Sequence, residues 1–391
     1  MQSAPVTDMS VAVRVYPLPP QDDDDDGSKR RKRQLPEEII IFDTETRTDE
    51  AQSLLFGSYR VYIAGEFIEE GLFYPEGLSR KELRVLRNYA QTHKPRTALH
   101  GVRELRLLKL EDFLKDFYRS AYKGRCLVVA FNHPFDLSRL AYGHVDGRGD
   151  FAGGFSLRLW ASRDANGVIC QNRNRPDIRI RHIDSKRALI QFTSRMTLDE
   201  EDAIPDDSET GEVVEGYNHR GHFLDLKTLA FALTDEGHSL ASACEAFEVE
   251  HGKKRAAQHG KLTAKYIDYN RRDVLATSEL AFKLLDEYQK HEITLQPTKA
   301  FSPATIGKSY LRDMGIAPVL ERQPTFPKPY LGFAQTAFFG GRTSAHIRKV
   351  AVPIVYTDFL SMYPTVNSLT GCGQRLRRKK LESKSTASGK S

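Results

Sequence analysis

Two carboxylates follow a short apolar run, where residues 37–45 are Glu-Glu-Ile-Ile-Ile-Phe-Asp-Thr-Glu. Asp43 and Glu45 are two residues apart, so on a β-strand their side chains point to the same face. Two carboxylates at the end of a buried strand repel each other and are costly to desolvate. A divalent metal ion shared between them would relieve both problems, and the other interpretation is a solvated strand end.

A third carboxylate, Asp136, lies at a predicted junction between a strand and a helix. The apolar residues 127–131 predict a second buried strand, which the segment 132–134 ends. Phe135 and Asp136 then open a helix, and a carboxylate is favoured near a helix N-terminus. Asp136 is therefore either a capping residue or a further metal ligand.

A phenol and a fourth carboxylate share one face of a late helix. Apolar residues recur at helical spacing over residues 262–288, and Tyr269 and Asp273 are four residues apart within this segment. Positions i and i+4 are neighbours on a helix, so the two side chains are expected side by side. The other interpretation is a core tyrosine beside a solvated aspartate.

The elements that position these side chains predict an α/β fold. The β-branched run before Asp43 predicts a buried central strand, and a hairpin with strands at 58–63 and 66–74 follows it, so the sheet is mixed. Asp225 ends a strand that runs into a helix, and a structural role is expected for it. The remaining expected elements are helices at 79–92, 103–122 and 239–247, strands at 155–160, 178–183 and 188–193, and a loop at 199–215.

Composition is that of a globular protein with 391 residues, 40% of them hydrophobic and 28% charged. No apolar run approaches the roughly 20 residues that span a bilayer, and no secretory signal is recognisable at the N-terminus. The four cysteines form no C-x-x-C pair, so reduced structural thiols in a cytoplasmic protein are expected.

Charge gathers at the two ends of the chain. Residues 375–391 hold seven basic residues and one acidic residue, which accounts for the whole net charge of +6. The remainder of the chain is therefore near neutral, and any nucleic-acid-binding groove would have to come from local arrangement and not from bulk charge. Near the N-terminus an acidic block at 22–26 precedes a basic block at 29–33, and such blocks do not pack. The basic block is interpreted as a solvated linker, with an import signal or a phosphate contact as alternatives.

The ordered set of D-x-E, N-x-x-F-D and Y-x-x-x-D resembles the three exonuclease motifs of family B DNA polymerases. These belong to the DEDD exonucleases of the RNase H-like (DnaQ-like) fold, in the subgroup whose last motif carries tyrosine. The resemblance implies 3′–5′ hydrolysis of DNA with two Mg²⁺ or Mn²⁺ ions, which would stabilise the attacking and leaving oxygens at the phosphate.

The same resemblance implies a role for each residue. Asp43 would bridge both ions, with Glu45 and Asp273 on one of them, and Asp136 would act on the second ion through water. Tyr269 would orient the attacking water. Two further positions match residues that contact the single-stranded 3′ end of DNA, namely Asn132 and Phe135.

Two later segments extend the resemblance toward a polymerase. The Phe-Phe-Gly-Gly-Arg segment at 338–342 partly resembles the Y-x-G-G linker of family B enzymes, and implies DNA contacts by Gly340, Gly341 and Arg342. An ordinary Gly-Gly turn is the alternative. Residues 355–369 resemble motif A of the polymerase palm, which implies a metal ligand at Asp358 and nucleotide contacts at Ser361 and Tyr363.

The polymerase resemblance ends after Leu369, before the nucleotide-binding lysine and the second palm carboxylate. We therefore expect that the chain alone does not polymerise, and that a separate chain or a downstream segment would complete the palm. A fragment end, a frameshift and a genuine divergent terminus are all compatible with the tail.

Five segments are expected, and two other functions compete with the leading one. A stand-alone DEDD exonuclease in repair or RNA trimming would have no use for the motif A segment. A non-catalytic DNA-binding protein would have no use for four placed carboxylates. The expected segments are a disordered region at 1–36, an exonuclease domain at 37–295, a connector at 296–350, the start of a palm at 351–371 and a basic tail at 372–391.

Overall fold

A six-stranded mixed sheet carries the central strand β1 (Glu38–Thr46), with the order β12-β5-β1-β2-β3-β4. A computed structural model describes residues 35–95, 105–163, 169–170, 172, 174–193, 219–253 and 259–316, with 319–322, 324–329, 332, 350, 352–353, 355 and 362–369 beyond them. Strand β1 is antiparallel to β2 and parallel to β5, which is parallel to β12. The α/β class with a mixed sheet is confirmed. The other strands are β2 (Leu54–Ile63), β3 (Glu66–Tyr74), β4 (Arg106–Lys109), β5 (Leu127–Ala130) and β12 (His222–Asp225).

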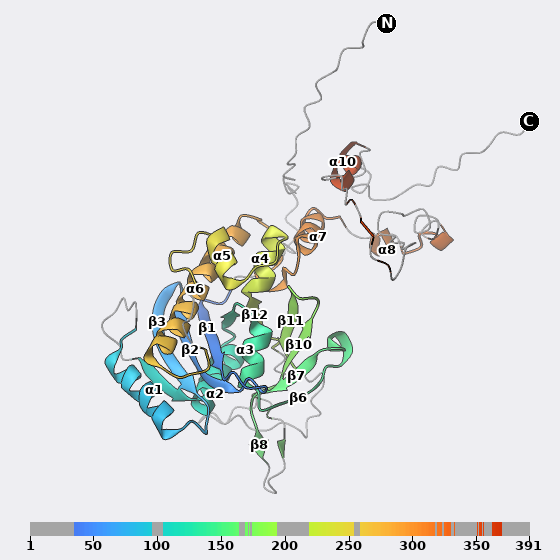
Figure 1. Ribbon diagram of the computed structural model, residues 1–391. Helices are drawn as coiled ribbons and strands as arrows, with labels where there is room; N and C mark the ends of the chain where they lie inside the picture. Colours follow the sequence, from blue (N-terminus) through green and yellow to red (C-terminus); the bar gives the residue numbers. More distant parts are fainter. Residues whose placement is uncertain are drawn as a thin grey trace, which may run out of the picture. The chain divides into compact units, whose positions relative to one another are not determined.

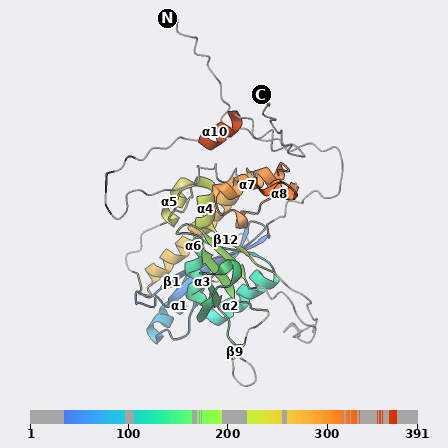
Figure 2. The same ribbon diagram turned by 90° about the vertical axis from the view of Figure 1, so that its right-hand side faces the viewer.

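The two faces of this sheet bury separate apolar clusters. On one face Phe42 packs against Phe113 of α2 (Leu110–Tyr118), with ring centroids 6.0 Å apart. On the other face Phe56 packs against Tyr266 of the long helix α6 (Ala264–Gln289), with centroids 5.5 Å apart. Figure 1 and Figure 2 show α6 running along the sheet beside β1 and β2. Because side chains alternate along β1, Asp43 and Glu45 lie on the α6 face.

The expected hairpin is confirmed. Strands β2 and β3 pair through Ile63 and Glu66, with a two-residue turn at Ala64 and Gly65. Both turn residues have positive φ, 51° and 82°, which suits the tight connection between antiparallel strands.

One predicted helix was wrong in part, because residues 103–122 do not form a single helix. Residues 106–109 form β4, which pairs in parallel with β3, and α2 begins only at Leu110. Residues 119–123 continue as a π-helical turn. The open edge of β3 offers backbone hydrogen bonds to the first residues, and this pairing overrides a periodicity that a helix would also satisfy.

The other predicted helices and strands are confirmed to within a few residues, whereas the short elements at 143–146, 149–151, 162–163, 169–170 and 297–299 were not predicted. The strands predicted at 155–160, 178–183 and 188–193 belong to a second sheet with the order β11-β10-β7-β6, and the expected loop at 199–215 lies outside the described residues. These elements are α1 (Arg80–Thr92), α3 (His133–Leu140), β6 (Gly143–Asp146), η2 (Gly149–Phe151), β7 (Phe155–Arg158), β8 (Ser162–Arg163), β9 (Ile169–Cys170), β10 (Ile178–His182), β11 (Ala188–Phe192), α4 (Leu226–Thr234), α5 (Leu240–Ala246) and η4 (Pro297–Lys299).

A buried ion pair fixes α6 against the sheet. Arg271 Nε lies 2.7 Å from Glu70 Oε1 of β3, and both side chains are at most 2% exposed. The same guanidinium donates to the Tyr89 hydroxyl on α1 and to the Lys94 carbonyl, each at 2.9 Å. These contacts join α6, β3 and α1 through one buried positive charge.

The chain divides into two units, Lys29–Gly307 and a second made of Met1–Ser28 with Lys308–Ser391. The first unit contains these two sheets and a third sheet of two strands, β8 and β9. The helix α7 (Pro303–Asp313) runs across the division, and the second unit contains α8 (Val319–Arg322) and α10 (Met362–Leu369). Among the described helices, none combines the length and apolar character that crossing a bilayer requires. Of the described cysteine side chains, Cys126 and Cys244 are free thiols.

Candidate active site

Asp43 and Glu45 are held by side chains of α6. The amide of Asn270 donates from Nδ2 to Asp43 Oδ2 at 2.7 Å, and the Tyr266 hydroxyl donates to Glu45 Oε2. Asn270 is itself fixed, because its Oδ1 accepts a hydrogen bond from Ser58 of β2. Both carboxylates at the end of β1 therefore face α6 and keep part of their surface accessible.

Asp136 reaches the same strand end from α3. The side chain of Thr44 donates from Oγ1 to Asp136 Oδ1 at 2.7 Å, and the Thr44 backbone N–H donates to the same oxygen at 3.0 Å. Thr44 stands between Asp43 and Glu45 on β1, so this contact brings Asp136 to the strand end that carries the other two carboxylates. Asp136 is 2% exposed, which makes its environment one of low polarity.

Asp273 joins the group from α6 and has one unused oxygen. Its Oδ2 lies 3.2 Å from the ammonium of Lys253, and the Tyr269 hydroxyl is hydrogen-bonded to its carboxylate, as the four-residue spacing predicts. Its Oδ1 is buried and has no hydrogen-bond partner. An unpaired buried carboxylate oxygen is costly, so this atom is a natural ligand for a cation.

The charges of the other three carboxylates act on Asp43. Burial raises the pKa of Asp43 well above its usual value, and the charges of Asp136, Glu45 and Asp273 raise it further. Burial likewise raises the pKa of Glu45 to about 7 and that of Asp136 to about 7. Such shifts are typical of like charges that share a site and await a cation.

Lys253 is the positive charge within this group. It lowers the pKa of Asp43, Glu45 and Asp273 against the larger effect of burial. Its ammonium also lies 5.8 Å from the ring centroid of Tyr269. Lys253 thus partly neutralises the carboxylates in the protein without metal.

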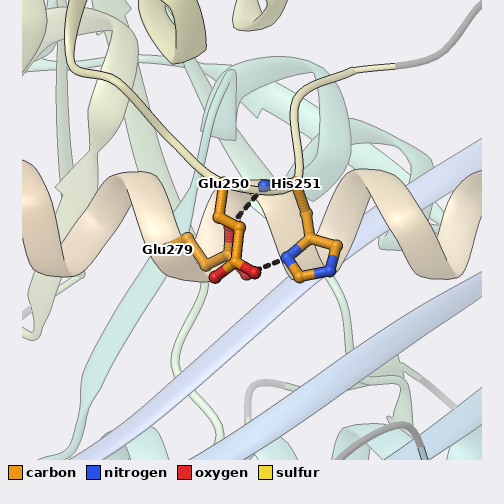
Figure 3. A group of neighbouring side chains, drawn as sticks. All are labelled: Glu250, His251 and Glu279. Atoms are coloured by element: carbon orange, nitrogen blue, oxygen red, sulfur yellow. Dashed lines mark hydrogen bonds and ion pairs between the residues drawn. The ribbon is translucent and has the colours of Figure 1, made fainter.

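The tightest set of metal-ligating groups in the described part of the chain lies elsewhere. Glu250, His251 and Glu279 have ligand atoms that all lie within 4.8 Å of one another, whereas no three of the four carboxylates described above meet this limit. In Figure 3, His251 and Glu279 face each other between the segment after α5 and helix α6. Glu279 accepts from the His251 backbone N–H at 2.9 Å, and its other oxygen lies 2.6 Å from Nδ1.

Within this second set, the contact between His251 and Glu279, called the clasp below, lies two residues before Lys253. Glu250 is exposed, and the side chains of His251 and Glu279 are 37% and 25% exposed. His251 and Glu279 satisfy each other, so their contacts explain the arrangement without an ion. Because Lys253 follows His251 by two residues, the clasp fixes the segment that delivers the ammonium to Asp273.

Asn132 and Phe135 lie at the start of α3. Asn132 is the exposed N-cap residue, and its side chain makes no capping hydrogen bond. Phe135 is half-buried, and the guanidinium carbon of Arg139 lies 5.0 Å from its ring centroid. Both side chains are thus placed beside Asp136 on the accessible end of the helix.

Asp225 has the structural environment expected for it. Its Oδ2 accepts from the hydroxyl of Thr228 at 2.6 Å and from the Thr228 backbone N–H at 3.2 Å, which caps α4. Its Oδ1 accepts from the His133 backbone N–H at 3.1 Å. Burial still raises its pKa to about 6.

Sequence reasoning missed the residues that hold the carboxylates. Lys253 lies in a polar segment with no periodicity to single it out. A signal existed for Asn270 and Tyr266, because they precede Asp273 by three and seven residues and so share its helix face. Thr44 also carried a signal as the residue between two carboxylates.

The side chains of the site residues predicted at 340–363 lie outside the part of the chain that the structure describes. Gly340, Gly341, Arg342, Asp358 and Ser361 are outside the described residues, and Tyr363 is described only as part of the backbone of α10. No protein-family model matches the chain, and no curated protein matches it significantly.

Proposed function

We propose that this chain is the N-terminal portion of a family B DNA-directed DNA polymerase and carries a metal-dependent 3′–5′ exonuclease. The observation that carries the proposal is the convergence of Asp43, Glu45, Asp136 and Asp273, in which three of the charges raise the pKa of the fourth. An RNase H-like assignment is supported by the central strand β1, which has an antiparallel hairpin on one side and parallel strands on the other.

The residues present fit a pair of hard divalent ions. The donors are carboxylate oxygens, which Mg²⁺ and Mn²⁺ prefer, and Asp273 Oδ1 is buried without a partner. Asp43, Glu45, Asp136 and Asp273 would hold the ions. When bound, the ions would supply charge stabilisation at the phosphate during hydrolysis.

The chain's own side chains would do the rest of the work. Tyr269 hydrogen-bonds Asp273 and projects its hydroxyl into the carboxylate group, where it can orient a water molecule for attack on the phosphodiester. Asn132 and Phe135 would hold the terminal nucleotide by a hydrogen bond and by stacking. Single strands are the preferred substrate, because a duplex end must first be unpaired.

The deciding experiment is digestion of 5′-labelled single-stranded DNA with Mg²⁺ or Mn²⁺. The wild-type chain should give a ladder that shortens from the 3′ end, and Asp43→Ala should give none. Asp286→Ala is the matched control, because Asp286 is an exposed carboxylate on α6 and its loss should leave the ladder unchanged. An intact ladder with Asp43→Ala, or no cleavage by a folded wild-type chain, would overturn the proposal.

Two further readouts define the activity. Blunt duplex DNA should be digested more slowly than the single strand, and the opposite order would contradict the proposed substrate. Primer extension by the 391-residue chain should fail, since only one palm carboxylate is present in the sequence.

A further inference from the structure

A pocket of about 300 Å³ is lined by residues that lie close in the chain to the proposed catalytic carboxylates, although none of the four carboxylates lines it. It lies between the end of β1, the segment after β3 and the end of α3, and its lining includes Arg47, Ser53, Pro75, Glu76, Arg139 and Tyr142. A pocket of this size holds a small-molecule-sized group such as one nucleotide unit.

Both arginines are close in the chain to residues of the candidate site. Arg47 follows Glu45 by two residues at the end of β1, a separation of about 7 Å along an extended chain. Arg139 follows Asp136 by three residues on α3, one helical turn away and on the same side of the helix. The pocket is therefore within reach of a strand whose end lies at the carboxylates.

The guanidinium of Arg139 is fixed in position before any ligand binds. Its Nη1 donates to the backbone carbonyls of Ala51 and Gln52 at 3.1 and 2.7 Å, and its Nε donates to Ser138. These partners are neutral oxygens, so the positive charge is retained at the pocket wall. A cation held in this way loses little conformational freedom when it meets an anion.

The opposite wall supplies a second cation, and the rim supplies an aromatic ring. Arg47 pairs with Glu82 at 3.0 Å but keeps 36% of its side chain exposed. Tyr142 is 48% exposed, so its ring is accessible for stacking by a base. Fixed cations beside an exposed aromatic ring are the combination with which proteins bind single-stranded nucleic acid.

We infer that this pocket binds the second nucleotide on the 5′ side of the scissile bond, with Arg47 and Arg139 on its phosphates and Tyr142 against its base. The inference rests on the proposed exonuclease function. It adds a substrate class, because an enzyme with this subsite prefers oligonucleotides over dinucleotides.

The test compares Arg47→Met and Tyr142→Ala with the wild-type chain on 5′-labelled oligonucleotides of two and ten residues. Each variant should raise KM for the ten-residue substrate by about three- to tenfold, the effect of one charge-assisted phosphate contact or one stacking contact, with kcat within about twofold. Neither variant should change KM for the dinucleotide, which does not reach the pocket.

Arg119→Met is the matched control, since Arg119 is an exposed arginine in an ion pair with Asp116 outside this pocket. Binding of the ten-residue DNA is also measured by fluorescence anisotropy in EDTA, where cleavage cannot occur. Arg47→Met should lower the slope of log affinity against log salt by about 0.7.

The outcomes separate the two proposals. Equal KM and equal affinity for Arg47→Met, Tyr142→Ala and Arg119→Met would overturn the subsite while leaving the nuclease intact. A wild-type chain that binds DNA through Arg47 and Tyr142 but never cleaves it would overturn the nuclease and keep the subsite. A folded chain that neither binds nor cleaves would overturn both.

Discussion

Helix α6 carries two buried charges only two residues apart, and their surroundings are opposite in kind. Arg271 has a carboxylate, a hydroxyl and a carbonyl as partners. Asp273 faces other carboxylates as well as the Lys253 ammonium, keeps one oxygen without a partner and has a raised pKa. One helix therefore holds a fully paired charge on the side that braces the fold and an incompletely paired charge on the side that faces the candidate site.

The difference separates stability from function along one element. Buried charges that serve the fold are paired, because an unpaired charge in the interior is costly. In a site that binds cations, the carboxylates instead repel one another in the metal-free protein, and the bound cation relieves this repulsion. The contrast between Arg271 and Asp273 is therefore a physical argument for a cation site that does not depend on any family resemblance.

The largest expected effect is on stability, from the loss of the buried ion pair between Arg271 and Glu70. Arg271→Met should lower the free energy of unfolding by about 3–5 kcal/mol, because it leaves Glu70 buried without its ion-pair partner. Urea denaturation followed by circular dichroism measures this. The exposed Arg87→Met on α1 is the control and should change stability by less than about 0.5 kcal/mol. A loss no greater than in the control would remove one side of the comparison.

The raised pKa values of the carboxylates should make the stability of the metal-free protein depend on pH. The pKa values of Glu45 and Asp136 are raised from 4.5 and 3.8 to about 7. The unfolded chain therefore loses these protons first, and stability falls as the pH rises from about 4 to about 7. Thermal melts in EDTA should show this fall, and Mg²⁺ should reduce it. A Tm that rises across this range in EDTA would contradict the prediction.

Neutralising one carboxylate should stabilise the protein while it removes activity. Asp273→Asn removes a like charge from the group around Asp43, so the metal-free protein at pH 8 should gain about 1 kcal/mol. Thermal melts in EDTA measure the gain, and the 3′ ladder should disappear. The exposed Asp286→Asn on the same helix should change neither. Destabilisation by Asp273→Asn would mean that Asp273 serves the fold.

The smallest expected effect concerns the internal cation. Lys253→Met removes an ammonium 3.2 Å from Asp273, so a divalent ion no longer competes with it for that carboxylate. The apparent affinity for Mg²⁺ should rise about threefold, a change below 1 kcal/mol that is reasonable for a partly exposed ion pair. Titration of Tm with Mg²⁺ measures it. The exposed Lys283→Met on α6 provides the baseline, and a weaker affinity for Mg²⁺ would contradict the competition.

The sequence was sufficient for features that repeat at a fixed period. Alternation on β1 put Asp43 and Glu45 together, and the four-residue spacing on α6 put Tyr269 beside Asp273, where the structure has a hydrogen bond. The junctions at Asp136 and Asp225 were also visible, because a strand ended and a helix began there. These inferences need only local geometry.

Features that depend on distant partners were not predictable. The residues of β4 were assigned to a helix because nothing in 103–122 reveals the open edge of β3, which pairs with them. Lys253 was missed because its role depends on its ion pair with Asp273, which is 20 residues away in the sequence. The contact between His251 and Glu279 lies in the segment that brings the two together. A side chain in a segment without periodicity has no local property that discloses its partner.

The separation between Asp43 and Asp273 along the chain also governs when the candidate site can exist. The hairpin of β2 and β3 can form soon after its residues leave the ribosome, because its contacts are local. The carboxylate group cannot, since α6 must be synthesised and docked before Asp273 meets β1. A nascent chain that has emerged only as far as α5 therefore lacks Asp273, and the complete group of four carboxylates forms only after α6 has been synthesised.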